Sequence, residues 1–222
     1  MWIKGRPRDG AGGMTPPAKT MREARPYGEE TRALILQAAE ALFAERGLHD
    51  VSMQDLADAA KVSRATVFNQ FGSKQLVLDA ITARSLGAYR ALLQKAVDDE
   101  TTPTPQLLRR LFRQMGKGIA ANQSLYREVF AEIRKVSMGL DCEGESPRLK
   151  RETSELLTRL FVRGQNRGEI SKSHPADVLA TAYDSLLSGA VIQWLHDRRK
   201  GALPGLLEAL VEVFLNGAGA KR

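Results

Sequence analysis

Apolar residues recur along this chain with the three-to-four-residue period of amphipathic helices, in segments separated by glycine, proline and short polar runs. In the first segment the apolar side chains between Leu34 and Phe43 share one helical face, and Gly47 follows where a left-handed residue ends a helix. Runs that favour strands are scarce, so we expect an all-α protein. The pattern predicts helices over 29–46, 52–60, 64–71, 74–98, 105–121, 124–139, 147–167, 175–197 and 204–216.

Two of these helices are short and have clear capping signals. Ser52 can cap the first of them, with Asp55 three residues later in the position of a capping box, and Ser63 can cap the second. Gly72 ends the second short helix, and Ser73 caps the long helix that follows. Two short helices joined by a tight turn, here residues 52–71, have the dimensions of a helix-turn-helix unit.

In such a unit the second helix enters the major groove of DNA, and its outward side chains face the base edges. Arginine pairs with guanine, asparagine and glutamine pair with adenine, and small methyl groups contact thymine. The outward residues expected here to meet bases are Arg64, Ala65, Thr66, Asn69 and Gln70. Residues at helix starts, where backbone N–H groups attract anions, are expected to hold phosphates: Ser52, Gln54, Ser63 and Lys74. Spacing alone also allows an ordinary short helix with one solvated face.

Residues 31–81 resemble the N-terminal DNA-binding domain of the TetR family. The resemblance rests on an initial T-R, then I-L-x-A-A-x-x-L-F-A-x-x-G, then L-A-x-A-A, and then V-S-x-x-T-x-F-x-x-F-x-S-K. It implies a three-helix helix-turn-helix domain at 29–89, a larger helical effector-binding and dimerisation domain at 90–222, and a homodimer on operator DNA.

The segment departs from the usual TetR pattern at three positions. Lys61 stands where the family usually has glycine in the turn, so we expect either a left-handed lysine, at a cost of about 1 kcal/mol, or a slightly different turn. The ammonium group of Lys61 could also reach a phosphate. Phe68 replaces a common tyrosine that contacts phosphate, and Gln70 replaces a common histidine, so the base preference cannot be copied from relatives.

The larger domain is expected to provide both a dimer contact and a cavity. Its last two predicted helices carry more apolar surface than one domain face needs, and small residues would allow close helix approach. The residues expected at the dimer contact are Ala182, Leu186, Gly189, Trp194, Leu207, Leu210 and Phe214. An intramolecular core is the alternative for these helices.

Large, adaptable side chains on the central helices are the candidates for a pocket that takes a small, mainly apolar effector. These candidates are Phe112, Met115, Tyr126, Phe130, Met138, Phe161 and Tyr183, and the few polar groups near them are Gln165, Asn166 and Asp184. Each of these side chains taken alone is more often a core residue than a pocket residue.

The chain carries a net charge of +7, but the charge is unevenly placed. Residues 1–28, expected to form a disordered basic arm, hold six basic and two acidic side chains, whereas residues 29–89 hold six and eight. The predicted DNA-binding domain is therefore not basic overall, which argues against a non-specific DNA binder. Within it, residues 61–74 hold three basic side chains and no acidic one.

These patterns together predict a sequence-specific transcriptional regulator, most simply a repressor that a small effector releases from its operator. Alternatives are a regulator controlled by a protein partner and a DNA-binding protein that acts without a ligand. No nucleophile motif, phosphate loop or metal-ligand spacing appears, and Cys142 is the single cysteine, so we expect neither catalysis nor a cofactor or metal. No signal peptide or membrane-length apolar run is evident, so we expect a cytoplasmic protein with no membrane partner.

Overall fold

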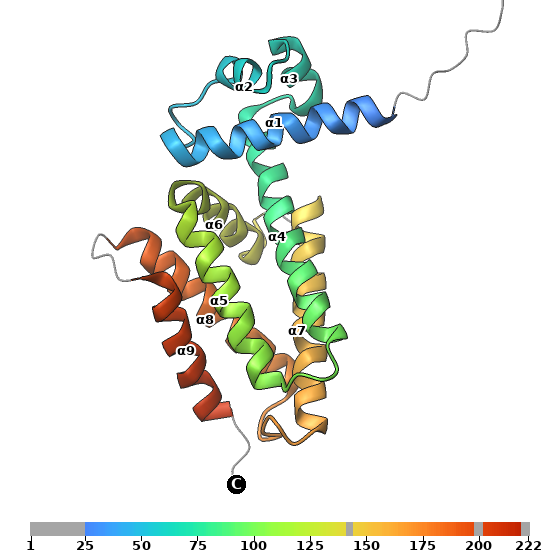
Figure 1. The fold of residues 1–222 in the computed structure, drawn as a ribbon, viewed down its shortest axis with the longest axis vertical. Coiled ribbons are helices and arrows are strands. Elements are labelled where there is room, and N and C mark those ends of the chain that lie inside the picture. The colour runs from blue at the N-terminus through green and yellow to red at the C-terminus, as the bar shows by residue number, and fades with distance from the viewer. Residues whose placement is uncertain (1–24, 141–143, 198–201, 219–222) are drawn as a thin grey trace, which may run out of the picture.

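The computed structural model describes residues 25–140, 144–197 and 202–218, and these residues form nine helices (Figure 1). The helices are α1 (Arg25–Arg46), α2 (Met53–Ala60), α3 (Arg64–Phe71), α4 (Lys74–Asp98), α5 (Thr104–Ala121), α6 (Gln123–Ser137), α7 (Glu145–Asn166), α8 (Ala176–His196) and α9 (Leu203–Ala218). The all-α fold class and the helices predicted from apolar periodicity are therefore confirmed, with small differences at the helix ends.

The start of α1 corrects one predicted boundary. The disordered arm was expected to reach residue 28, but residues 25–28 already belong to α1. The remainder of that predicted arm lies outside the described residues, as does Cys142.

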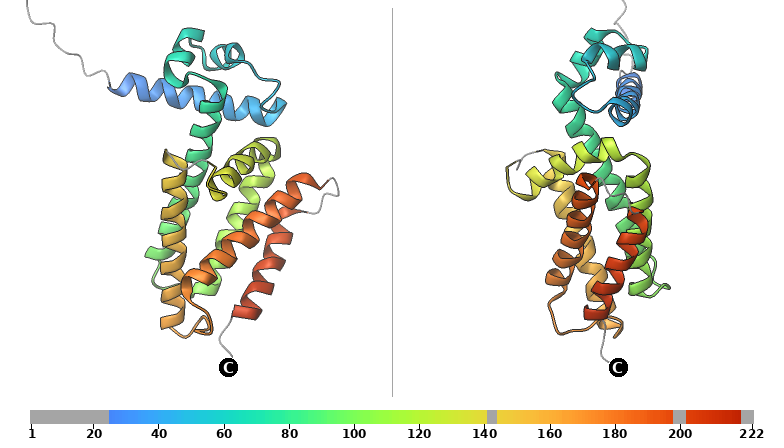
Figure 2. Two further views of the ribbon diagram at one scale, coloured as in Figure 1. Left: turned by 180° about the vertical axis from the view of Figure 1, so that it is seen from behind. Right: turned by 90° about the vertical axis from the view of Figure 1, so that its left-hand side faces the viewer.

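The helices form a small N-terminal unit on top of a larger helical body (Figures 1 and 2). α1 lies crosswise over the upper part of α4, and α2 and α3 lie on the side of α1 that faces away from the body. α4 leaves this unit and runs down into the body, where α7 packs along it. α6 lies directly beneath α1 and contacts it. A change in the body can therefore reach the N-terminal unit through α4 and through α6.

Buried apolar side chains form one large cluster in each part. The N-terminal cluster joins α1, α2, α3 and the first half of α4, and the larger cluster joins the second half of α4 with α5 to α9. α6 belongs to both: Leu125 and Val129 are buried in the N-terminal cluster, and Phe130 is buried in the larger one. Tyr126 packs against both clusters. α6 thus packs in both cores and connects them.

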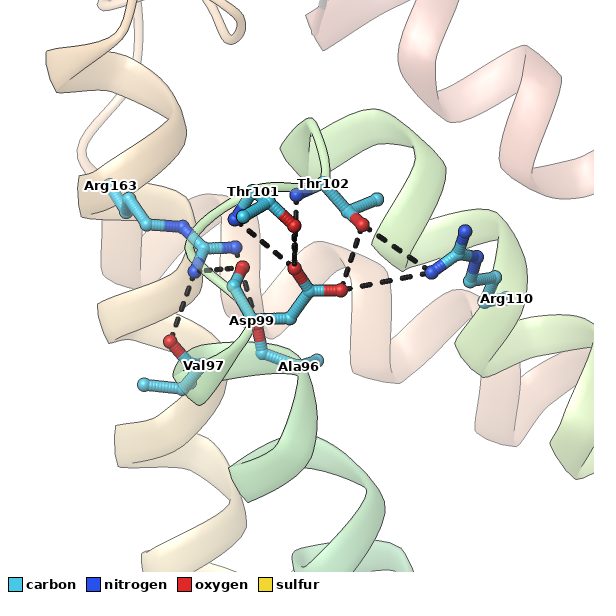
Figure 3. Close-up of polar contacts among 7 residues, drawn as sticks. All are labelled: Ala96, Val97, Asp99, Thr101, Thr102, Arg110 and Arg163. Carbon is cyan, nitrogen blue, oxygen red and sulfur yellow. Dashed lines mark hydrogen bonds and ion pairs between the residues drawn. The ribbon is translucent and has the colours of Figure 1, made fainter.

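The end of α4 is fixed to α7 by one arginine (Figure 3). The guanidinium of Arg163 donates hydrogen bonds to the carbonyl oxygens of Ala96, Val97 and Asp99, at 3.2, 3.0 and 2.9 Å. These carbonyls lack helical partners at the end of α4, so the arginine satisfies them. The carboxylate of Asp99 accepts hydrogen bonds from the two threonines that follow it in the loop to α5, which lowers the pKa of Asp99 well below its usual value.

The last turn of α7 approaches its neighbours so closely that only glycine fits at position 164. A Cβ atom there would lie 2.7 Å from Cγ1 of Ile170 and 3.0 Å from Cγ2 of Thr104. Gly164 therefore permits the tight packing of α7 against the start of α5 and the turn that follows α7.

α8 is long and apolar enough to cross a membrane by length and composition alone, although polar residues such as Asp177 and Asp184 interrupt its apolar positions. Of the most apolar 18-residue stretch of α8, 39% is buried inside the structure. Its buried residues Leu179, Tyr183, Leu187 and Val191 pack in the larger core. A core helix of a soluble protein passes the same test, so this feature is weak evidence for a membrane span.

Candidate nucleic-acid interface and internal cavity

The local sequence builds the helix-turn-helix unit through its caps. Ser52 accepts a hydrogen bond from the amide of Asp55, and the Asp55 carboxylate accepts one from the amide of Ser52, which completes the predicted capping box. The Ser52 hydroxyl also donates to the Asp55 carboxylate, and this hydrogen bond, together with the one from the Ser52 amide, holds the pKa of Asp55 below its usual value. Ser63 accepts from the amide of Thr66, so it caps α3 as predicted. Both short helices therefore begin where the sequence places them.

The turn between α2 and α3 contains a left-handed lysine. Lys61 has φ 56° and ψ 42°. Among the described residues other than glycine, it alone has a positive φ. Its amide donates to the carbonyl oxygens of Ala57 and Asp58, which ends α2. Of the two predicted alternatives, the left-handed lysine is therefore the one observed, and the side chain of Lys61 is exposed.

α3 presents the predicted base-reading residues outward. Arg64, Ala65 and Asn69 are exposed, and Thr66 and Gln70 are half-buried. Val67 and Phe71 point inward and are buried. Ser52, Gln54 and Ser63, expected to meet phosphate, are exposed, and the side-chain amide of Gln54 donates to Asp58 on the same helix. The geometry thus leaves one mainly polar face of α3 open to solvent.

Phe68 lies on the same face and is 40% exposed, although it is a large apolar residue. The guanidinium of Arg64, one helical turn earlier, lies 5.3 Å from the centre of the Phe68 ring. A cation over an aromatic face is stabilised by the ring quadrupole. Phe68 therefore orients the arginine that we expect to read a guanine.

Two charged residues in this unit act differently from what the sequence suggests. Arg32 of α1 donates to the carbonyl of Gln70 at 2.9 Å and covers the ring of Phe71 at 4.1 Å, so it fixes the end of α3 to α1. No local sequence pattern signals this role of Arg32. Lys74 was expected to hold phosphate, but its ammonium donates to carbonyl oxygens of the α1–α2 loop at Leu48, His49 and Val51. An ammonium has three N–H donors, so this side chain is a structural clamp and not a phosphate contact.

A cavity of about 160 Å³ lies among α4, α5, α6, α7 and α8. Three of the predicted pocket residues, Met115, Tyr126 and Phe130, line it. Leu86, Leu92, Ile119, Val129 and Leu187 supply most of the remaining apolar wall. The cavity touches both α4 and α6, the helices that also enter the N-terminal core.

Four predicted pocket residues lie elsewhere. Phe112, Phe161 and Tyr183 are fully buried in an aromatic cluster of the larger core, with ring centroids of Phe112 and Tyr183 4.3 Å apart. The Tyr183 hydroxyl donates to the carbonyl of Leu108 at 2.7 Å, which satisfies it within the core. Met138 is 61% exposed just after α6. The helical period identified the inward faces, but it did not tell which inward faces meet a hollow.

Several polar side chains line the cavity. Among them, Asp184 was predicted as a polar candidate, whereas Tyr89 and Lys150 were not. Tyr89 of α4 is buried, and its hydroxyl has no hydrogen-bond partner. Lys150 of α7 and Asp184 of α8 form an ion pair in the wall, with Nζ and Oδ2 2.5 Å apart. Burial and the nearby Asp184 raise the pKa of Tyr89 well above its usual value, so its hydroxyl stays protonated. Gln165, another polar candidate, instead donates to the carbonyls of Ser171 and His174.

The predicted dimer residues fall into three groups by burial. Leu207 and Phe214 are buried in the larger core of the protomer, so they cannot supply surface to a partner, which corrects that expectation. Ala182 and Gly189 of α8 are exposed. Leu186, Trp194 and Leu210 are half-buried. In the described part of the chain, no three His, Cys, Asp or Glu side chains gather in a way that could hold a metal ion.

Comparisons with known proteins bear on this arrangement. Residues 35–81 match the family model described as bacterial regulatory proteins, tetR family. The chain is 27% identical over 190 residues to the HTH-type transcriptional repressor BepR of Brucella suis, covering 81% of this chain and 87% of that protein. It is 25% identical over 203 residues to the HTH-type transcriptional regulator EthR of Mycolicibacterium smegmatis, covering 88% and 89%.

The fold is similar to that of the transcriptional regulator FadR of Bacillus subtilis, solved in complex with stearoyl-CoA. The TM-score is 0.68 at 17% identity, and the match covers 83% of this chain and 98% of FadR. The matched region 35–81 contains both helices of the unit described above and the turn that holds Lys61. Residues 35–81 therefore match the DNA-binding segment of the tetR family of bacterial regulatory proteins, and over most of its length the chain is similar to DNA-binding transcriptional regulators.

Proposed function

We propose that this protein is a homodimeric repressor that binds operator DNA through α3 and is released when a small, mainly apolar effector enters the cavity among α4 to α8. The observation that carries the proposal is the double role of α6. Leu125 and Val129 pack in the N-terminal core, whereas Tyr126 and Phe130 of the same helix line the cavity. An effector that displaces these rings moves α6, and α6 moves the unit that holds α3.

Coupling of this kind needs an effector that binds one conformation better than the other. In a dimer, the two recognition helices must be spaced to enter successive major grooves about 34 Å apart. A small rotation of each N-terminal unit, transmitted through α4 and α6, changes this spacing. In this proposal the DNA-binding domain ends at residue 89 and the effector-binding domain begins at residue 90. α4 runs through this boundary without a break and so connects the two domains.

The cavity favours a small effector in the conformation described. A dry cavity of about 150 Å³ accommodates a benzene ring, whereas pockets for drug-sized ligands usually exceed about 300 Å³. The stearoyl-CoA held by FadR of Bacillus subtilis is far larger than the cavity of about 160 Å³ found here. We therefore favour a ring-sized effector over a long-chain acyl-CoA.

The dimer contact is proposed on the exposed sides of α8 and α9. Val178, Ala182 and Gly189 follow one outward stripe of α8, and Leu206 and Val213 are exposed large apolar residues on α9. Small residues on α8 allow close approach of a second copy. Burial of this stripe would also explain the apolar composition of α8, because only part of that helix is buried in the protomer.

The first test is binding of the purified protein to the DNA upstream of its own coding region, measured by fluorescence anisotropy at fixed salt with random DNA as competitor. Arg64→Ala should lose roughly tenfold or more of the preference for the upstream DNA, the factor expected for one bidentate base contact. Arg159→Ala, an exposed arginine on α7, is the matched control and should keep the preference. Equal loss in both variants, or no preference in the parent protein, would overturn the proposal.

A further inference from the structure

The ion pair between Lys150 and Asp184 stands between two hollows. The internal cavity is lined by both residues, and so is a groove on the surface formed by α7, α8 and the end of α6. Ser188 lines both hollows as well. The side chains of Lys150 and Asp184 are 23% and 24% exposed. The pair therefore forms part of the wall between the cavity and the groove.

The two partners differ in how far they can move. Lys150 has a four-carbon stem, and its ammonium can swing into the groove and become hydrated. Asp184 has a short side chain on α8 and must stay at the wall. When the pair opens, the charge that remains at the cavity is the negative charge of Asp184.

The cavity offers a second acceptor beside that carboxylate. The hydroxyl of Tyr89 is buried, lines the cavity and has no hydrogen-bond partner. A buried hydroxyl without a partner has lost its hydration without compensation, so a ligand that pairs with it gains binding free energy. An ammonium group has several N–H donors and can serve the hydroxyl oxygen and the carboxylate together. The neighbouring rings of Tyr126 and Phe130 offer faces that attract a cation.

We propose that the Lys150–Asp184 pair is a displaceable gate, and that the cavity takes a ring-sized apolar compound carrying a protonated amine, which replaces the Lys150 ammonium at Asp184. The regulatory meaning of this binding rests on the proposed function above. In the described part of the chain, the charged residues that line the groove are Lys150, Arg151 and Asp184. Among these residues, the displaced ammonium of Lys150 therefore meets no carboxylate other than that of Asp184. Hydration of the Lys150 ammonium in the groove compensates for the loss of its ion pair with Asp184.

The experiment is calorimetric titration of the full-length protein without DNA, using three probes with the same ring: benzylammonium, benzyl alcohol and benzoate. Benzylammonium should bind the parent protein most tightly. Asp184→Asn should weaken benzylammonium roughly tenfold or more, as expected for the loss of one charge-assisted hydrogen bond, and should leave benzyl alcohol within about twofold. Asp177→Asn, at the exposed start of α8, is the matched control and should change neither.

Lys150→Met provides an independent test if Asp184→Asn fails to fold. This substitution removes the ammonium that pairs with Asp184 and keeps a side chain of similar length. Benzylammonium should therefore bind this variant roughly tenfold more tightly than it binds the parent protein. Weaker binding of benzylammonium by this variant, preference of the parent protein for benzoate, or binding of none of the three probes would overturn the proposal. Binding of benzylammonium without release of operator DNA would support the gate but would contradict effector control in the proposed function.

Discussion

The left-handed lysine in the turn between α2 and α3 gives a prediction with two separate readouts. Lys61 has φ 56°, where a side chain crowds the following carbonyl at a cost of about 1–2 kcal/mol, and glycine has no such cost. Glycine also gives the unfolded chain more freedom, which offsets about 0.4–1 kcal/mol of the gain. We therefore expect Lys61→Gly to raise the free energy of unfolding by about 0.5–1 kcal/mol, or Tm by roughly 1–4 °C in a chain of this size.

The same substitution should weaken binding to DNA if the ammonium of Lys61 meets a phosphate. Loss of one phosphate contact per protomer lowers the slope of log affinity against log salt by about 0.9 for each copy, or about 1.8 for a dimer. Stability is measured by thermal unfolding, and the slope by fluorescence anisotropy over a salt series.

Lys61→Ala separates the two effects. It removes the ammonium but keeps a Cβ atom in the left-handed conformation, so the salt slope should change as in Lys61→Gly while Tm does not rise. Equal Tm values for the two variants would refute the strain argument. An unchanged salt slope in both would show that Lys61 does not contact phosphate.

Three further predictions concern other parts of the molecule. Gly164→Ala should lower the free energy of unfolding by about 1–3 kcal/mol, because the added methyl group overpacks the core. Gly87→Ala is the control: nothing lies near its added methyl group, so the free energy of unfolding should rise by under about 1 kcal/mol. Chemical denaturation measures both changes, and equal effects would contradict the packing argument. Phe68→Tyr should strengthen operator binding a few-fold by adding a neutral phosphate donor, with an unchanged salt slope in the anisotropy assay; no gain would mean that this ring does not face the backbone. Asp99 has a lowered pKa, so it stabilises the folded state above its usual pKa and loses this effect as the pH falls below about 4. Asp99→Asn should therefore lower Tm at pH 7, and thermal unfolding should show the difference from the parent shrinking in acid; a constant difference would contradict this reasoning.

The α-helical framework and the outward face of α3 could be predicted from the sequence because their signals are local. A cap needs a serine and an acidic residue three positions apart, as at Ser52 and Asp55, and both hydrogen bonds are present. An amphipathic helix needs only a periodic apolar face. The outward positions of Arg64 and Asn69 follow from the same period once Val67 and Phe71 are assigned to the core.

What each buried or charged side chain meets depended on tertiary structure. Periodicity places Phe112 and Met115 on inward faces of α5 alike, yet one is in the solid core and the other lines the cavity, because the packing of α5 against distant helices decides where space remains. Lys74 clamps a loop far before it in the chain instead of holding phosphate. The pair of Lys150 and Asp184 joins residues 34 positions apart, and no local pattern signals such a contact. Local signals determined the helices and their caps, whereas the cavity, the gate and the link through α6 exist only because helices distant in sequence pack side by side.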